Sequence, residues 1–146
     1  MTRKANKLAF DQIKIHDVFE FTRKVTQKEV ARFAELSGDL NPIHVDEDFA
    51  KATPFGQRIA HGMLLASFFS SLVGMYCPGE NSLYLSQSLN FRKPLFLGRE
   101  VKVRGEVIGK SDSLKLITLR TTIVEGDEVL VFGEAKVKFL EASHAV

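Results

Sequence analysis

Cysteine is almost absent from this sequence, because Cys77 is the only one among 146 residues. A disulfide framework and a cysteine-based metal site both need more than one thiol, so the sequence excludes both. For Cys77 we favour a buried or half-buried thiol over a nucleophile.

Net charge is also small. The chain has 20 Lys and Arg residues against 18 Asp and Glu residues, a formal net charge of +2, and the basic residues are spread along it. A nucleic-acid footprint usually needs clustered positive charge, so we expect no nucleic-acid partner. A small basic patch for an anionic ligand stays compatible with this distribution.

Long apolar runs are missing as well. The longest, residues 62–77, is interrupted by serines and falls short of the about 20 residues that a membrane-spanning helix needs. The N-terminal residues lack the apolar segment of a signal peptide. We therefore expect no membrane partner and a cytoplasmic location, and leave organellar targeting open because Arg3, Lys4 and Lys7 precede the first acidic residue.

What is present is typical of one globular domain. The hydrophobic content of 45% and the charged content of 26% are ordinary, and the length can bury a substantial core. Residues 1–9 are polar and are expected to form a flexible N-terminus. Residues 10–141 are expected to form the single domain.

Two helices are predicted. Thr26 and Glu29 form a capping box, and Ser37 with Gly38 supplies a stop, which places a helix at residues 27–37. Residues 62–75 are apolar on nearly all faces and long enough for about four turns. A helix of this kind is expected in the middle of the fold.

The second half of the chain predicts strands. Their pattern follows a short strand at 18–25 and continues, without intervening helices, at residues 83–91, 100–108, 114–124 and 129–139. Consecutive strands of this kind form an antiparallel sheet, so the predicted class is α+β, a sheet wrapped around one central helix. An exposed sheet edge would be protected by a second copy, and we expect a homodimer.

Residues 39–60 form a long polar stretch, and long connections in compact domains tend to be functional. Asp39 and His44 lie on either side of Asn41-Pro42, where a turn can bring their side chains to a common point. Such a pair can hold one water molecule, remove its proton and return a proton to carbon. From the spacing alone, a catalytic pair is only as well supported as purely structural roles, in which Asp39 caps a turn and His44 is a hydrogen-bonded interior histidine.

Gly62 stands where the apolar helix begins. The unpaired N–H groups and the positive dipole end found there can stabilise an enolate oxygen, although an ordinary helix-start glycine is the simpler interpretation. His61 is more simply a histidine satisfied by backbone groups than a ligand or base. A metal site of His44, His61, Asp46 and Asp48 has no recognised ligand spacing, and we expect no metal.

Three segments resemble one known family. SGDLNPIHVDEDFA, FGQRIAHGMLLASFFSSLVG and YLSQSLNFRKPLFLGREVKV closely resemble MaoC-like hydratases of the hot-dog fold. More narrowly, they resemble the (R)-specific enoyl-CoA hydratases that supply polyhydroxyalkanoate synthesis. The resemblance extends from about Phe10 to Leu140.

This resemblance implies a site. Asp39 and His44 match the family's catalytic pair, and Gly62 matches the glycine whose N–H binds the thioester oxygen. Ser70 matches a serine near the acyl pocket. Together with Asn41 and His61, it is expected to bind an acyl-CoA thioester, with no cofactor.

The expected activity is reversible hydration of trans-2-enoyl-CoA to (R)-3-hydroxyacyl-CoA. Arg92, Lys93 and Arg58 are candidates for a cationic rim around the ligand's phosphates. Alternatives are dehydration of (R)-3-hydroxyacyl thioesters in fatty-acid synthesis, thioester hydrolysis, and a non-catalytic acyl-CoA-binding hot-dog subunit.

Overall fold

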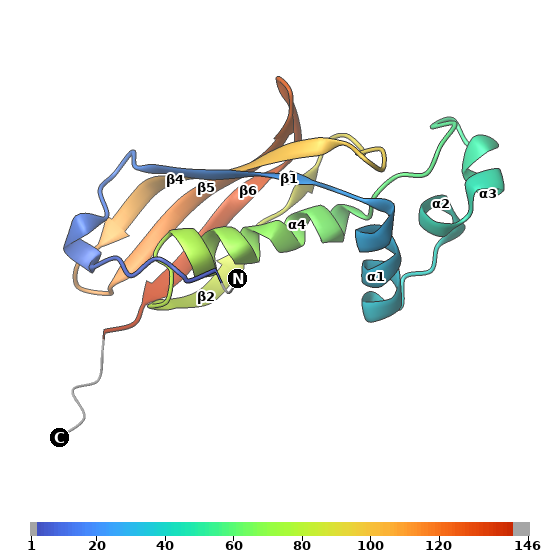
Figure 1. Cartoon of the computed structure of the whole chain (residues 1–146). Coiled ribbons are helices and arrows are strands. Elements are labelled where there is room, and N and C mark those ends of the chain that lie inside the picture. Colours follow the sequence, from blue (N-terminus) through green and yellow to red (C-terminus); the bar gives the residue numbers. More distant parts are fainter. Residues whose placement is uncertain (1–2, 142–146) are drawn as a thin grey trace.

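The computed structural model describes residues 3–141 and contains a six-stranded antiparallel sheet wrapped on one side of a helix (Figure 1). The strand order is β1-β4-β5-β6-β2, and β3 pairs with β6. The strands are β1 (Val18–Lys24), β2 (Ser82–Gln87), β3 (Asn90–Phe91), β4 (Glu100–Ser111), β5 (Leu116–Glu125) and β6 (Glu128–Phe139). The predicted α+β class is therefore confirmed.

Strands β4, β5 and β6 have the alternation of a sheet with one covered face. Val101 and Val103 of β4 and Ile123 of β5 point inward and are buried, whereas the residues between them are more exposed. Their partners follow in register, with Val103 opposite Ile123. Each fully buried aliphatic side chain contributes about 1.5–3 kcal/mol, so this face holds the sheet on the helix.

The covering helix is α4 (Gly62–Ser71), which continues as a π-helical segment, η2 (Leu72–Tyr76). Leu65, Phe69 and Leu72 are buried and belong to one cluster with the inner residues of β4 and β5. A Cβ on Gly105 would lie 2.7 Å from Leu72 Cδ2. Glycine at that point lets the helix approach the sheet closely.

The predicted central helix is confirmed, but its sides are not all covered. Met63, Ser67 and Ser70 are exposed and lie along one side of α4. The sheet covers the opposite side only, as Figure 1 shows. One side of the helix is therefore buried and the other is exposed, although most of its residues are apolar.

Three short helices lie beyond the N-terminal end of α4 (Figure 1). They are α1 (Gln27–Ser37), α2 (Pro42–Val45) and α3 (Glu47–Lys51). The capping box of Thr26 and Glu29 is present, and Gly38 ends α1 with a left-handed φ of 79°. The irregular stretch predicted at residues 39–60 contains α2 and α3, because Asn41 and Asp46 each cap a short helix with their side chains.

The predicted strand at residues 83–91 is broken into β2 and β3. A Cβ on Gly133 of β6 would lie 1.8 Å from the carbonyl oxygen of Ser88, so the chain crosses β6 closely at the break.

Near the N-terminus, residues 10–12 form a 3-10 turn, η1 (Phe10–Gln12), and Asn6 donates its N–H to Met75 O at 2.8 Å. The division into a flexible segment 1–9 and a domain 10–141 stays a prediction.

Within residues 3–141, no helix is both long and apolar enough to cross a membrane.

Candidate active site

Asp39 is held by the end of α1. The left-handed Gly38 turns the chain, and the N–H of Asp39 then donates to Ser37 Oγ at 3.2 Å. One carboxylate oxygen, Oδ1, accepts the N–H of Asn41 at 3.2 Å. The second oxygen, Oδ2, is left to face the space in front of α2.

His44 projects from α2. Asn41 begins this helix by accepting the N–H of Ile43 at 3.1 Å, with Pro42 in the first helical position, which proline favours. The Nδ1 of His44 lies 2.7 Å from the carbonyl oxygen of Ile59. Because a carbonyl oxygen only accepts, Nδ1 carries a proton, and Nε2 is the nitrogen available for chemistry.

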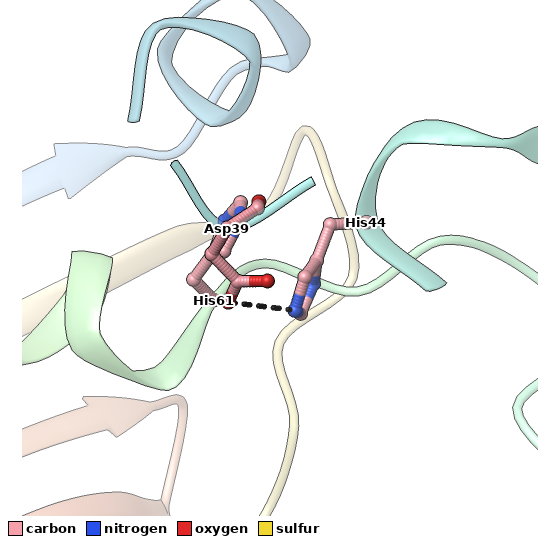
Figure 2. A group of neighbouring side chains, drawn as sticks. All are labelled: Asp39, His44 and His61. Carbon is pink, nitrogen blue, oxygen red and sulfur yellow. Dashed lines mark hydrogen bonds and ion pairs between the residues drawn. The ribbon is translucent and has the colours of Figure 1, made fainter. Parts of the chain in front are cut away.

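The carboxylate of Asp39 and the ring of His44 face each other (Figure 2). His44 Nε2 lies 3.9 Å from Asp39 Oδ2, with the two side chains 12% and 52% exposed. This distance is too long for a direct hydrogen bond, but one oxygen atom can lie within hydrogen-bonding distance of both groups. The pair is therefore arranged to hold a water molecule or a hydroxyl group.

His61 lies behind the pair and is only 2% exposed. Its Nε2 donates to the carbonyl oxygen of Asp39 at 3.0 Å, and its ring stacks on His44 with centroids 3.8 Å apart. Burial, more than any other cause, lowers the pKa of His61 below its usual value, and the charge of His44 adds to this. The hydrogen bond to the carbonyl of Asp39 and the charge of its carboxylate act in the opposite direction.

Gly62 is the first residue of α4, directly after His61 as N-cap. The N–H groups of Leu64 and Leu65 already donate to the carbonyl oxygen of His61, at 3.1 and 3.3 Å. The N–H of Gly62 belongs to the first turn, where no carbonyl of the same helix is available. A Cβ at this position would lie 2.8 Å from Cδ1 of Phe91, so only glycine fits beside that ring without movement.

A cavity of about 430 Å³ joins these parts. Asp39, His44, His61 and Gly62 all line it. Its other walls come from Met63 and Leu65 of α4, from the segment Phe91–Leu95 and from Val131 of β6, together with Ile59 and Ala60. The cavity is mostly apolar with a few polar groups, as is typical of a small-molecule site.

Among the described residues, Asp39, His44 and His61 are the one group with metal-ligand potential, since one atom of each lies within 4.8 Å of the others. The two imidazole planes meet at only 26°. Lone pairs in nearly parallel stacked rings run side by side and do not converge on one tetrahedral ion. Asp46, part of the metal set weighed from the sequence, instead caps α3 through Phe49 N–H at 3.0 Å.

The structure brings four of the predicted site residues together: Asp39, His44, His61 and Gly62. Asn41 is exposed, does not line the cavity, and uses its side chain to cap α2. Ser70 is exposed on α4, about 12 Å along the helix from Gly62 at 1.5 Å per residue, and does not line the cavity. A contact of either with substrate stays a prediction.

Sequence reasoning missed two residues. Ile59 supplies the carbonyl that fixes His44, and its backbone also pairs with that of Phe96. Phe91 forms the wall over Gly62. Each contacts a residue that is distant in the sequence, and no sequence motif marks either position. Next to Phe91, only the charges of Arg92 and Lys93 indicated a possible role in binding.

An α+β domain with an acid–histidine pair near the start of its central helix is what the resemblance to MaoC-like hydratases implied. The chain belongs to this family, because the model described as "MaoC like domain" matches residues 11–140. The resemblance seen in the sequence and the hot-dog fold that it implied are confirmed.

Individual relatives agree. An (R)-specific enoyl-CoA hydratase of Aeromonas caviae is 50% identical over 111 residues, which are 75% of this chain and 83% of that protein. A 3-hydroxybutyryl-CoA dehydratase of Methylorubrum extorquens is 40% identical over 131 residues, covering 90% and 83%. The solved structure of an (R)-hydratase from A. caviae, described as involved in PHA biosynthesis, has a TM-score of 0.85 at 43% identity, covering 87% of this chain and 97% of that one.

Proposed function

We propose that the protein catalyses the reversible hydration of trans-2-enoyl-CoA to (R)-3-hydroxyacyl-CoA. The observation that carries this is the 3.9 Å separation of Asp39 Oδ2 and His44 Nε2, in a mostly apolar cavity that Gly62 also lines. The names of the Aeromonas caviae relatives, an enoyl-CoA hydratase and an (R)-hydratase, support the same reaction.

The proton roles follow from the hydrogen bonds around the pair. Asp39 keeps Oδ1 on the N–H of Asn41 and offers Oδ2 to the water as base. The Nδ1–H of His44 donates to Ile59 O, which turns Nε2 toward the carboxylate of Asp39. Its Nε2–H then serves as the acid that protonates C2 while the water oxygen attacks C3. Because both groups face the substrate from one side, water adds syn.

Gly62 supplies the third component. As water attacks C3, negative charge develops on the thioester oxygen, and a fixed N–H at a helix N-terminus stabilises that charge. Met63, Leu65 and Leu95 line the same cavity as Gly62, and these apolar walls suit an acyl chain. This arrangement separates the charge-stabilising donor from the two proton-transferring groups.

The phosphates of CoA need a cationic partner outside the cavity. Lys93 is paired with Glu128 at 2.8 Å, and Arg58 is paired with Glu47 at 3.0 Å. Arg92 lines both the catalytic cavity and a neighbouring groove of about 500 Å³ over β5 and β6. Of the three basic residues considered from the sequence, Arg92 is therefore the best placed for this role.

Crotonyl-CoA distinguishes the candidate reactions. A hydratase removes the absorbance of the conjugated double bond without releasing thiol. Release of free thiol would instead identify a thioesterase, and tight binding without turnover would identify a non-catalytic subunit. Several relatives are named dehydratases, so the reverse reaction is the second candidate. Faster turnover of a carrier-protein thioester than of the matched CoA thioester would favour that role in fatty-acid synthesis.

We also propose a homodimer joined at β2. This strand lies at one end of the sheet order, and Leu83 and Leu85 on it are 49% and 54% exposed. An unpaired edge with large apolar side chains favours pairing with a second copy. Sedimentation should give twice the 16.3 kDa of one chain, and Leu85→Glu should shift the species toward one chain. A wild-type monomer at micromolar concentration would contradict the dimer.

An (R)-3-hydroxyacyl-CoA product is compatible with a supply role in polyhydroxyalkanoate synthesis, as in the description of the A. caviae structure. We place this role in the cytoplasm.

A further inference from the structure

His61 is the one described side chain with a buried polar atom that lacks a hydrogen-bond partner, its Nδ1. Leaving such an atom unpaired costs about 1–3 kcal/mol. The other ring nitrogen, Nε2, donates to the carbonyl of Asp39 and therefore carries the proton. Because the unpaired Nδ1 lowers the stability of the folded protein, a role in the site explains the presence of this ring better than stability does.

The bond from His61 to Asp39 connects two segments that are 22 residues apart. Asp39 lies in a loop after α1, whereas His61 is the N-cap of α4, directly before Gly62. The bond at 3.0 Å therefore sets where the Asp39 main chain lies relative to the start of α4. The position of the carboxylate relative to the Gly62 N–H depends on it.

The ring of His61 also fixes the ring of His44. The two stack with centroids 3.8 Å apart, and Phe33 of α1 packs edge-on against His61 at 4.9 Å. His44 has one hydrogen bond at its Nδ1, about which the ring can still swing. Stacking against His61 removes that freedom and keeps Nε2 directed at Asp39.

We propose that His61 is a positioning residue that keeps a neutral Nε2–H tautomer and holds the carboxylate of Asp39 and the ring of His44 one water molecule apart. This role rests on the proposed function and acts through the pair, not through substrate. A neutral ring suits it, because a positive charge on His61 would oppose the donation of a proton by the stacked His44 during the reaction. The charged groups that act on His61 are His44 and Asp39.

Two variants separate the contributions. His61→Gln keeps an N–H donor that can reach the Asp39 carbonyl, whereas His61→Phe keeps a ring for His44 and loses the donor. We expect kcat with crotonyl-CoA to fall about 10- to 100-fold in His61→Phe, the size of effect that slight misplacement of reacting groups produces. The fall should be smaller in His61→Gln. KM should stay within about threefold of wild type in both, because binding is left intact.

Unchanged kcat in the folded variants would overturn the proposal, and so would a rise in KM with normal kcat, which would make His61 a substrate contact. If the variants do not fold, a measurement on the wild-type protein still tests the proposal. In ¹⁵N-histidine NMR spectra, His61 should be a neutral Nε2–H tautomer at pH 7, and Nδ1 of His44 should be protonated. A charged or Nδ1–H His61 would contradict the proposal. Absence of wild-type hydration would instead refute the proposed function, which the tautomer does not test.

Discussion

Replacing Asp39 or His44 with asparagine should lower kcat for crotonyl-CoA by about 10²- to 10⁴-fold, the usual contribution of a general acid or base. Asparagine at position 39 keeps an oxygen to accept the Asn41 N–H. At position 44 its amide can donate to Ile59 O in place of Nδ1–H. Each change therefore removes proton transfer and preserves the local hydrogen bonding. Thermal unfolding should shift little for Asp39→Asn, since exposed changes usually stay within about 0.5 kcal/mol, and more for His44→Asn, whose side chain is 12% exposed and stacks on His61.

Matched controls are available on the same chain. Asp48→Asn changes an exposed aspartate of α3 that does not line the cavity. His16→Asn changes an exposed histidine with a φ of 75°, a conformation that asparagine tolerates. Both controls should keep wild-type turnover. Near-normal kcat in either Asp39→Asn or His44→Asn would refute the assignment of that residue.

Gly62→Pro should lower kcat by removing a single hydrogen-bond donor, the backbone N–H that faces the thioester oxygen. Proline is tolerated in the first position of a helix, and the preceding His61 has φ −61° and ψ 133°, which a residue before proline adopts readily. The helix should therefore form. Loss of one oxyanion donor typically costs about 10²- to 10³-fold in kcat.

Gly62→Ala is the control, because it adds a similar Cβ against Phe91 and keeps the N–H. Phe91 is exposed enough to move aside, so we expect a modest loss in the alanine variant. The difference between the proline and alanine variants measures the N–H alone. Equal kcat in the two would show that this donor does not stabilise the transition state.

Local patterns accounted for much of the fold. The capping box of Thr26 and Glu29 and the stop at Gly38 place α1 at its observed bounds, since these signals act within a few residues. Alternating apolar residues placed β4, β5 and β6 to within a few residues. The start of α4 at Gly62 also followed from the sequence, because its apolar run begins there.

The remaining features depend on contacts between distant segments. The break between β2 and β3 arises where the chain passes Gly133, and no local signal marks it. The exposed side of α4 follows from which face the sheet covers, and a run of apolar residues does not reveal that. Likewise, the His44–His61 stack requires the loop after α1 to fold back on the N-cap of α4.

For the candidate site, the motifs predicted which residues meet but not how. Asp39, His44 and Gly62 line one cavity, as expected. The spacing of Asp39 and His44 was equally compatible with turn chemistry, and the tautomer of His44 became readable only from the Ile59 carbonyl. Ser70 differs from these residues: it matches the family motif, but within a single chain it does not line the cavity.

The stereochemistry of hydration in D₂O tests the central claim most directly. Asp39 and His44 lie 3.9 Å apart on one side of the cavity, so deuterium and the hydroxyl oxygen should add to the same face of trans-crotonyl-CoA. We expect a single diastereomer of (R)-3-hydroxybutyryl-CoA, identified by the NMR coupling between the C2 and C3 protons and by chiral analysis. An anti product or no hydration would contradict a water-holding pair at this site, and the (S) configuration would contradict the proposed product.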